Sequence, residues 1–410
     1  MAHAVNSPGR LASSARRGRR RSARDHAGEY EQIALVMQGG GALGAYQCGV
    51  YEALHEADIQ PGWFAGTSIG AINAAIIAGN APADRIDRLR AFWNRITRHA
   101  GSIAWPLDAL AAMAVWMPPG NVLATGLSAT SALGSLGLGQ DGFFEPRGVS
   151  PLLFADGSAQ ATSFYDTAPL KDTLERLIDF DRINHGEVRL SVGAANVNSG
   201  NVRYFDSAHE TLCAEHIMAS AALPPAFPAI EIDGEFWWDG GIVSNTPLDH
   251  VLAGVPRHDS LVLQVDLWSA RGLPPKTIMD VLERQKDIQY SSRTRFGTDT
   301  IAREQKLRNA LGMLIEQLPG GALPPALQDA LQPWLCDRVF NIVHLIYQAK
   351  HHEEQFKDYA FAPATMREHW SGGLADMRLT LQRPQFFELP SRELGVVTHD
   401  IHRTLAAALP

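Results

Sequence analysis

The fold is decided by the stretch IALVMQGGGALG at residues 33–44, in which five apolar residues lead almost directly into a series of glycines. A short continuous apolar run is typical of a strand buried on both faces, as in a parallel sheet. Beyond the glycines, apolar residues recur at spacings of three and four as far as Leu54, which indicates a helix that ends before Pro61-Gly62. We therefore expect a strand, a glycine loop and a helix in succession.

The same order of elements repeats in the residues that follow. A second apolar run, WFA, occupies residues 63–65, and helical patterns follow at 69–78 and 86–96. Strands that alternate with helices predict an α/β fold, with a mostly parallel sheet sandwiched between helices. Further strands are expected at 188–197 and 201–205 as a hairpin, and at 235–238 and 261–267.

The composition divides the chain of 410 residues into an Arg-rich, disordered tail at 1–30, an α/β domain at 31–270 and an α-rich C-terminal region at 271–410. Ordered structure is expected to begin at Gln32, and the C-terminal segment 339–359 is expected to be helical. Residues 101–140 carry a single charge and could form a cap that meets acyl chains at a lipid surface. Buried cover for the sheet and a contact between two copies of the chain are the alternatives.

The net charge of −8 conceals an asymmetry between the N-terminus and the rest of the chain. Residues 1–24 contain seven arginines and no acid, whereas the remainder holds 29 basic against 44 acidic residues. The basic arm could contact an anionic membrane or the surface of a lipid granule, or it could be a solvated tail. No nucleic-acid partner is expected for the acidic body. Three scattered cysteines and the lack of a 20-residue apolar run favour a cytoplasmic protein, either soluble or bound peripherally to a membrane.

The second strand runs into Gly66-Thr67-Ser68-Ile69-Gly70, which fits the GxSxG nucleophile elbow. In this motif a serine projects from a sharp turn between a strand and a helix. Gly66 and Gly70 are the small residues that such a turn needs. Ser68 is therefore the candidate nucleophile.

The first glycine loop supplies backbone N–H groups that could stabilise an oxyanion; the candidate donors are Gly39, Gly40, Gly41, Ala42 and Gly44. Only one strand-helix unit separates this loop from Ser68, so both can lie on one edge of a parallel sheet. The loop also fits GxGxxG, a dinucleotide fingerprint that needs an acidic residue at the end of the second strand. Asp58 precedes that strand, so we favour the oxyanion hypothesis.

A serine hydroxyl needs a base, and the best candidate is Asp239 in the sequence WWDGG at 237–241. Gly240 and Gly241 would free its carboxyl to face the sheet edge, and the two tryptophans would raise its basicity by excluding water. An Asp-Gly pair that only caps a turn is the alternative. A Ser-His-Asp triad also stays open, although no motif ties a histidine to Ser68. The HHEE sequence at 351–354 lacks the HExxH spacing, so neither a metal nor a cofactor is predicted.

Together, the GGGxxG loop, the GxSxG motif 27 residues later and the distant DGG are similar to the patatin-like phospholipase family. This resemblance implies a Ser68–Asp239 dyad, without a metal, and an oxyanion hole in the backbone of residues 39–44. The block SAALP at 220–224 resembles another element shared by the family. The resemblance covers residues 33–248, and the region beyond resembles an accessory region of some bacterial members. Leu43 departs from the family, which usually has Arg or Lys there, and this change could weaken catalysis or alter the head group accepted.

The sequence thus predicts a serine acyl hydrolase that cleaves lipid carboxylic esters, of the phospholipase A or lipid acyl hydrolase type, through an acyl-serine intermediate. The same dyad could act instead on thioesters or on a hydroxyalkanoate polyester. A catalytically silent protein that binds a lipid or granule surface is a third hypothesis. A homo-oligomer is left open.

Overall fold

The computed structural model describes residues 21–98, 139–158, 160–319, 322–348 and 357–401. The expected cap at 101–140 lies outside these ranges, except for its last two residues. None of the described helices combines the length and the apolar character that a membrane span requires.

Nine strands of the described ranges form one central sheet, which runs in the order β11-β10-β9-β1-β2-β5-β8-β7, with β6 paired to β5. Neighbours from β11 to β5 are parallel, whereas β6, β8 and β7 pair antiparallel. The strands are β1 (Gln32–Met37), β2 (Trp63–Thr67), β5 (Arg189–Asn196), β6 (Val202–Asp206), β7 (Ile230–Ile232), β8 (Glu235–Asp239), β9 (Ser260–Asp266), β10 (Phe340–Ile346) and β11 (Val396–Asp400). A separate pair joins β3 (Glu145–Pro146) to β4 (Tyr165–Asp166). The expected hairpin, β5 with β6, and the mostly parallel sheet are confirmed.

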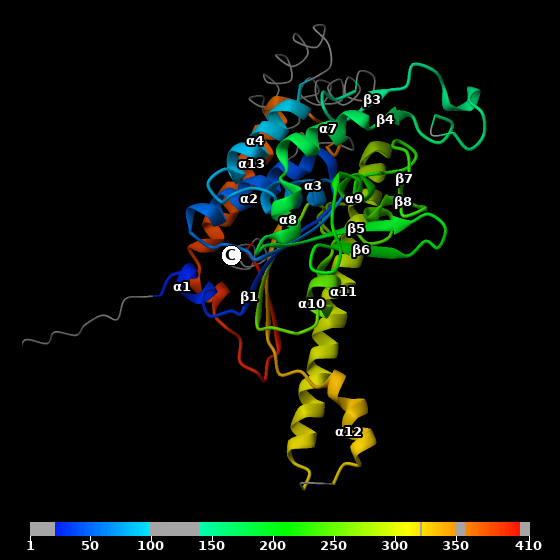
Figure 1. Ribbon diagram of the computed structural model, residues 1–410. Helices are drawn as coiled ribbons and strands as arrows, with labels where there is room; N and C mark the ends of the chain where they lie inside the picture. The colour runs from blue at the N-terminus through cyan, green and yellow to red at the C-terminus, as the bar shows by residue number, and fades with distance from the viewer. Residues whose placement is uncertain (1–20, 99–138, 159, 320–321, 349–356, 402–410) are drawn as a thin grey trace, which may run out of the picture.

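Helices cover both faces of this sheet, which explains why β1 is apolar throughout (Figure 1). Leu35 and Met37 share one core with the helices of the larger layer, whereas Ala34 and Val36 pack with the helices of the other face. The larger layer contains α2 (Ala45–Glu56), α3 (Ile69–Ala78), α4 (Arg85–Ile96), α7 (Ala168–Leu177), α8 (Phe180–His185), α9 (Ala214–Ser220) and α13 (Pro363–Leu381). The opposite face is covered by α10 (Leu248–Ala253) and the middle of α11 (Ile278–Glu316). The remaining helices are α1 (Ala23–Ala27) and α12 (Pro325–Leu331), and the latter folds back beside the far end of α11.

The C-terminal region is helical, as expected, but it also extends the central sheet. The prediction of a helix at 339–359 is wrong for its first part, because Phe340–Ile346 forms β10, which pairs parallel with β9. This seven-residue run, apolar except for Asn341 and His344, is almost fully buried, and such runs suit a buried strand as well as a helix. α13 packs directly on α2, and a Cβ at Gly373 would overlap the carbonyl oxygen of Tyr46.

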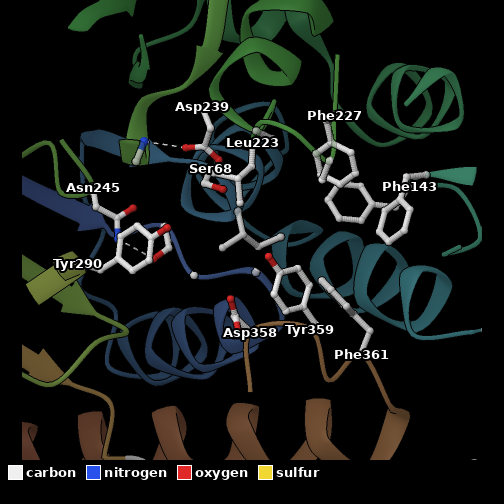
Figure 2. A pocket seen from close by; sticks show the side chains of 18 of the residues that line it. Ser68, Phe143, Leu223, Phe227, Asp239, Asn245, Tyr290, Asp358, Tyr359 and Phe361 are labelled. Atoms are coloured by element: carbon white, nitrogen blue, oxygen red, sulfur yellow. Dashed lines mark hydrogen bonds between the residues drawn. The ribbon is translucent and has the colours of Figure 1, made fainter. Parts of the chain in front are cut away.

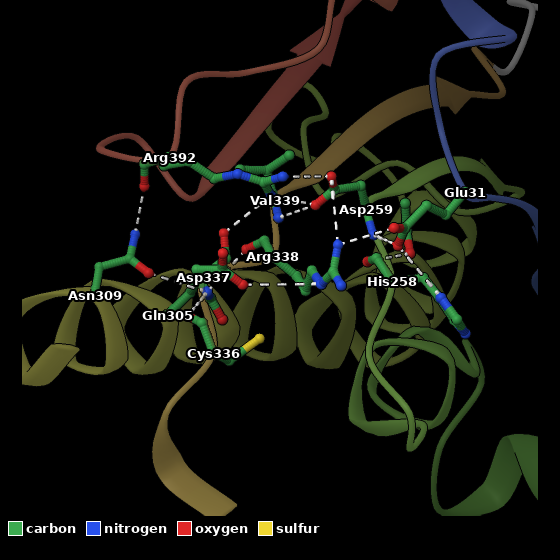
Figure 3. Close-up of polar contacts among 11 residues, drawn as sticks. Glu31, His258, Asp259, Gln305, Asn309, Cys336, Asp337, Arg338, Val339 and Arg392 are labelled. Atoms are coloured by element: carbon green, nitrogen blue, oxygen red, sulfur yellow. Dashed lines mark hydrogen bonds and ion pairs between the residues drawn. The ribbon is translucent and has the colours of Figure 1, made fainter. Parts of the chain in front are cut away.

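Polar contacts join the C-terminal strands to the beginning of β9 and β1 (Figure 3). The Asp259 carboxylate accepts hydrogen bonds from the Val339 N–H at 3.0 Å and from the Arg392 guanidinium, including one of 2.7 Å. The Arg338 guanidinium donates to Glu31 at 2.9 Å. These contacts thus join the N-terminal and C-terminal parts of the chain at the edge of the sheet where β1, β9 and β10 begin.

Ordered structure begins before Gln32, where we had expected a disordered tail. Ser22 caps the short helix α1 in a reciprocal capping box with Asp25, and both Ala23 and Ala27 are buried. The Tyr30 hydroxyl donates to a carbonyl of the C-terminal region, that of Glu388, at 2.8 Å. Only residues 1–20 of the predicted tail lie outside the described ranges.

Candidate active site

Ser68 stands at a sharp turn between β2 and α3, where the chain must reverse direction within one residue. Its backbone has φ 57° and ψ −127°, a conformation that non-glycine residues rarely adopt. A Cβ at Gly66 would overlap the Gly70 carbonyl, and a Cβ at Gly70 would overlap the Met37 carbonyl. Both glycines of the motif are therefore required by close backbone packing at the elbow.

The segment SAALP at 220–224 is hydrogen-bonded both to the elbow and to the candidate base. The Ser68 N–H donates to the backbone carbonyl and to the hydroxyl of Ser220, both at 3.1 Å. Two residues on, the carbonyl of Ala222 accepts the Asp239 N–H at 2.9 Å. Residues 220–222 therefore set the position of Ser68 relative to Asp239.

Asp239 ends β8 and is almost completely enclosed, with 1% of its surface exposed. Its carboxylate accepts the Gly241 N–H at 2.7 Å, and the Ser68 side chain lies near enough to influence its pKa. Burial raises the pKa of Asp239 to about 7, although the Gly241 N–H and the Ser68 side chain both oppose this rise. The carboxyl thus lies next to the candidate nucleophile and has a pKa near neutral pH.

The N–H groups of the glycine loop are not all available to an oxyanion. Gly39 donates its N–H to the Asn245 carbonyl at 3.2 Å, and Ala42 donates its N–H to the Asp358 carbonyl at 2.9 Å. Within the described ranges, the N–H groups of Gly40 and Gly41 donate to no protein acceptor, and both residues line the pocket beside Ser68. Of the five predicted donors, Gly40 and Gly41 are therefore the two that line the pocket and have no protein acceptor for their N–H groups in the described part of the chain.

Gly44, at the end of the loop, is required for close packing against α3. It closes the 3₁₀ turn Gly41–Gly44, and a Cβ there would overlap the Ile69 side chain. This contact lets the loop lie directly against the start of α3, beside the elbow.

A pocket of about 790 Å³, partly open to solvent, extends from Ser68 (Figure 2). One side is aromatic and consists of Phe143, Phe144, Tyr165, Phe227, Tyr359 and Phe361. Asn245, Tyr290 and Asp358 line a more polar side, and no Lys or Arg is among the described residues that line the pocket. The pocket therefore offers an apolar surface to an acyl chain and no cation to an anionic head group.

Sequence reasoning missed several residues that shape this site. The Asn245 side chain donates to the Gly39 carbonyl at 3.0 Å, and the Trp268 indole donates to the same carbonyl at 2.8 Å. Asp358, Tyr359 and Phe361 reach the pocket from the C-terminal region. These contacts join residues more than 200 positions apart, and no local motif marks them.

The alternative triad finds no support in the described part of the chain. His250 pairs with Asp206 at 3.0 Å and stacks on Tyr204, and no histidine lines the pocket. Among the described residues, no group of three or more His, Cys, Asp or Glu side chains could share a metal ion. The HHEE sequence lies outside the described ranges.

A serine at a strand-to-helix elbow on a mostly parallel sheet is an arrangement typical of serine hydrolases. The family model described as patatin-like phospholipase matches residues 35–252, more than half of the chain. The chain belongs to the patatin-like phospholipase family, and it is a lipid ester hydrolase. A second family model, described as patatin phospholipase, matches residues 288–393 and thus covers much of the C-terminal region.

Twelve chains of solved structures are similar to this protein. One is the crystal structure of VipD from Legionella pneumophila, with 14% identity and a TM-score of 0.39, over 86% of this chain and 67% of that one. No curated protein matches the chain.

Proposed function

We propose that this protein hydrolyses lipid carboxylic esters through a Ser68–Asp239 dyad and an acyl-serine intermediate. The observation that supports the dyad most strongly is that Ser68 lies in the same pocket beside Asp239, whose burial raises its pKa to about 7. A base with this pKa can accept the serine proton during attack and pass it to the leaving alcohol at neutral pH. The motif residues Gly66, Gly70, Gly240 and Gly241 would shape the two turns that present the dyad.

In the proposed reaction, the Ser68 hydroxyl transfers its proton to Asp239 while its oxygen attacks the ester carbonyl carbon. The N–H groups of Gly40 and Gly41 would stabilise the resulting oxyanion. The tetrahedral intermediate then collapses, the alcohol leaves with the proton from Asp239, and Ser68 stays acylated. Asp239 next takes a proton from water, the hydroxide attacks the acyl-serine, and the fatty acid leaves as Ser68 recovers its proton.

The aromatic side of the pocket supports a substrate with an acyl chain, because it offers a continuous apolar surface beside Ser68. Esters, thioesters and hydroxyalkanoate polyesters pass through the same oxyanion, so the dyad serves each of them. A lipid carboxylic ester, rather than a thioester or a polyester, is the substrate that we propose, since it matches the chemistry of the family.

Peripheral contact with an anionic membrane or granule surface is a further part of the proposal. Arg21 pairs with Glu29, and Arg24 pairs with Asp58, so these two arginines are engaged within the folded protein. We assign the contact to the five arginines of residues 1–20. Co-sedimentation with anionic vesicles should weaken on removal of residues 1–20, and unchanged binding would argue against this role.

The dyad is tested with Ser68→Ala and Asp239→Asn, each assayed with a short p-nitrophenyl ester and a fluorophosphonate probe. Both variants should lose turnover, and Ser68→Ala should lose labelling. Ser199→Ala and Asp181→Asn, at exposed positions in a turn and in α8, serve as matched controls. Full turnover in either dyad variant would contradict the proposed dyad. Failure of the folded wild type to react with the probe would favour the hypothesis of a catalytically silent protein that binds a lipid surface.

A further inference from the structure

The glycine loop is held from outside its own domain, by the segment Lys357–Phe361, which we call the C-terminal strap. The Asp358 carbonyl accepts the Ala42 N–H at 2.9 Å. Gly41 has φ +55°, and a Cβ there would overlap the Asp358 carbonyl oxygen. The strap thus packs against the backbone of the loop at Gly41, which lines the pocket and whose N–H has no protein acceptor in the described ranges.

Ion pairs from α11 fix the strap in this position. The Lys286 ammonium lies 3.0 and 3.1 Å from the two carboxylate oxygens of Asp358. The neighbouring Lys357 is 4% exposed and pairs with Asp287 at 2.7 Å and with Glu283 at 3.1 Å. Buried charges persist only when they are paired in this way, so the strap is tightly anchored.

A second path connects the strap to the beginning of the loop. The Lys357 ammonium lies 5.3 Å from the centre of the Trp268 ring, within range of a cation–π interaction. The Trp268 indole in turn donates to the Gly39 carbonyl. The loop is therefore held at Gly39 and at Ala42, on either side of the two free N–H groups.

We propose that the C-terminal strap is a positioning element of the oxyanion hole, which aims the N–H groups of Gly40 and Gly41 at the reacting carbonyl. Lys286, through Asp358, would take the place of the cation that this loop lacks at Leu43. Leu43 itself is completely buried in the apolar core. This inference rests on the proposed function, and it makes the C-terminal region part of the machinery of catalysis rather than an accessory.

The test compares Lys286→Met with the conservative Lys286→Arg and with Arg378→Met. The last variant removes another ion pair between the C-terminal region and α2, that of Arg378 with Glu56, away from the pocket lining. Each variant is assayed for kcat and KM, and for its affinity for two ligands of equal chain length. One is a trifluoromethyl ketone, which forms an oxyanion adduct with the serine, and the other is the corresponding alcohol, which does not.

In Lys286→Met we expect kcat and the affinity for the ketone to fall about tenfold, less than the roughly 10²–10³-fold loss on removal of an oxyanion donor, because both donors stay and only their position changes. KM and the affinity for the alcohol should change little, Lys286→Arg should recover most of kcat, and Arg378→Met should resemble the wild type. Asp358→Asn provides a second variant if Lys286→Met unfolds, with the same expected pattern.

Wild-type kcat in folded Lys286→Met, or an equal loss of affinity for the ketone and the alcohol, would overturn the role of the strap while leaving the dyad intact. Failure of the proposed function has a different signature, because Ser68→Ala would then keep its turnover and the wild type would not discriminate between the ketone and the alcohol. That outcome would overturn both proposals.

Discussion

The Ser220 hydroxyl accepts the Ser68 N–H at 3.1 Å and donates to the Gly193 carbonyl at 2.7 Å, and Ser220 is fully buried. One side chain thus connects the elbow between β2 and α3 to the neighbouring strand β5. This link matters because the Ser68 backbone is held in a rarely populated conformation that costs on the order of 1–3 kcal/mol. Such a conformation persists only where surrounding contacts determine it.

We expect Ser220→Ala to lower both stability and kcat. The Gly193 carbonyl would lose its side-chain donor, and the Ser68 N–H would lose one of its two acceptors. The expected cost is about 1–3 kcal/mol in the free energy of unfolding. Urea unfolding and ester hydrolysis measure the two effects. Ser207→Ala is a matched control, because its hydroxyl accepts the Leu190 N–H away from Ser68, so it should lose stability and keep kcat. Wild-type values of both quantities in Ser220→Ala would contradict this role.

Activity should rise with pH as the carboxyl of Asp239 ionises. Only the carboxylate can accept the serine proton, and burial raises the pKa of this group to about 7. We therefore expect kcat/KM to increase from pH 5 and to level off above pH 7 to 8. A profile that is flat between pH 5 and 9 would show that Asp239 does not act as the base.

The same pKa predicts that Asp239→Asn stabilises the protein at alkaline pH. Because the pKa is about 7 in the folded state against an ordinary value of 3.8, the folded state favours the protonated carboxyl. The stability that this group contributes is fully present below pH 4 and is lost as the pH rises through 7. Thermal unfolding at pH 8 should show a gain for Asp239→Asn of up to about 4 kcal/mol, at 1.36 kcal/mol per pKa unit. The gain should vanish at pH 4, and Asp181→Asn should show none at either pH.

The elbow at Ser68 could be predicted from the sequence because a strand, a short glycine motif and a helix follow one another there. Gly66 and Gly70 are fixed by contacts within or next to the turn, and WWDGG ends a strand whose apolar run is visible in the chain. The sequence did not indicate which N–H groups of the glycine loop are free of a protein acceptor. Which N–H groups of residues 39–44 stay free depends on Asn245 and Asp358, which lie far along the chain.

The C-terminal strands were missed for a related reason. The run FNIVHLI at 340–346 carries no signal that separates a buried strand from a buried helix, and its partner β9 lies about 80 residues earlier. Parallel pairing of this kind is decided by tertiary packing. The role of Lys357 in the strap likewise depends on Glu283 and Asp287 of α11, which lie about 70 residues earlier and pair with it.

Substrate choice should favour esters with neutral head groups over anionic phospholipids. The described pocket residues include no Lys or Arg, and residues 99–138 contain none either. An anionic phosphate would therefore enter without a cationic partner, beside the Asp239 carboxyl. A panel of diacylglycerol, phosphatidylcholine, phosphatidylglycerol, acyl-CoA and polyester substrates in detergent micelles tests this preference. A higher kcat/KM for phosphatidylglycerol than for diacylglycerol would contradict it.

Stability against acid should depend on the contact between Asp259 and Arg392, which joins β9 to the segment before β11. Burial opposes the charge of Asp259, but hydrogen bonds from Arg392 and the Val339 N–H outweigh it and hold the pKa of Asp259 below its ordinary value. A lowered pKa contributes stability that is present above pH 4 and is lost as the pH falls through the folded-state value. Because the Arg392 side chain is about half exposed and thus screened by solvent, Arg392→Met should cost about 1 kcal/mol in urea unfolding at pH 7 and less near pH 3. Equal losses at both pH values would mean that Arg392 acts through packing rather than through its charge.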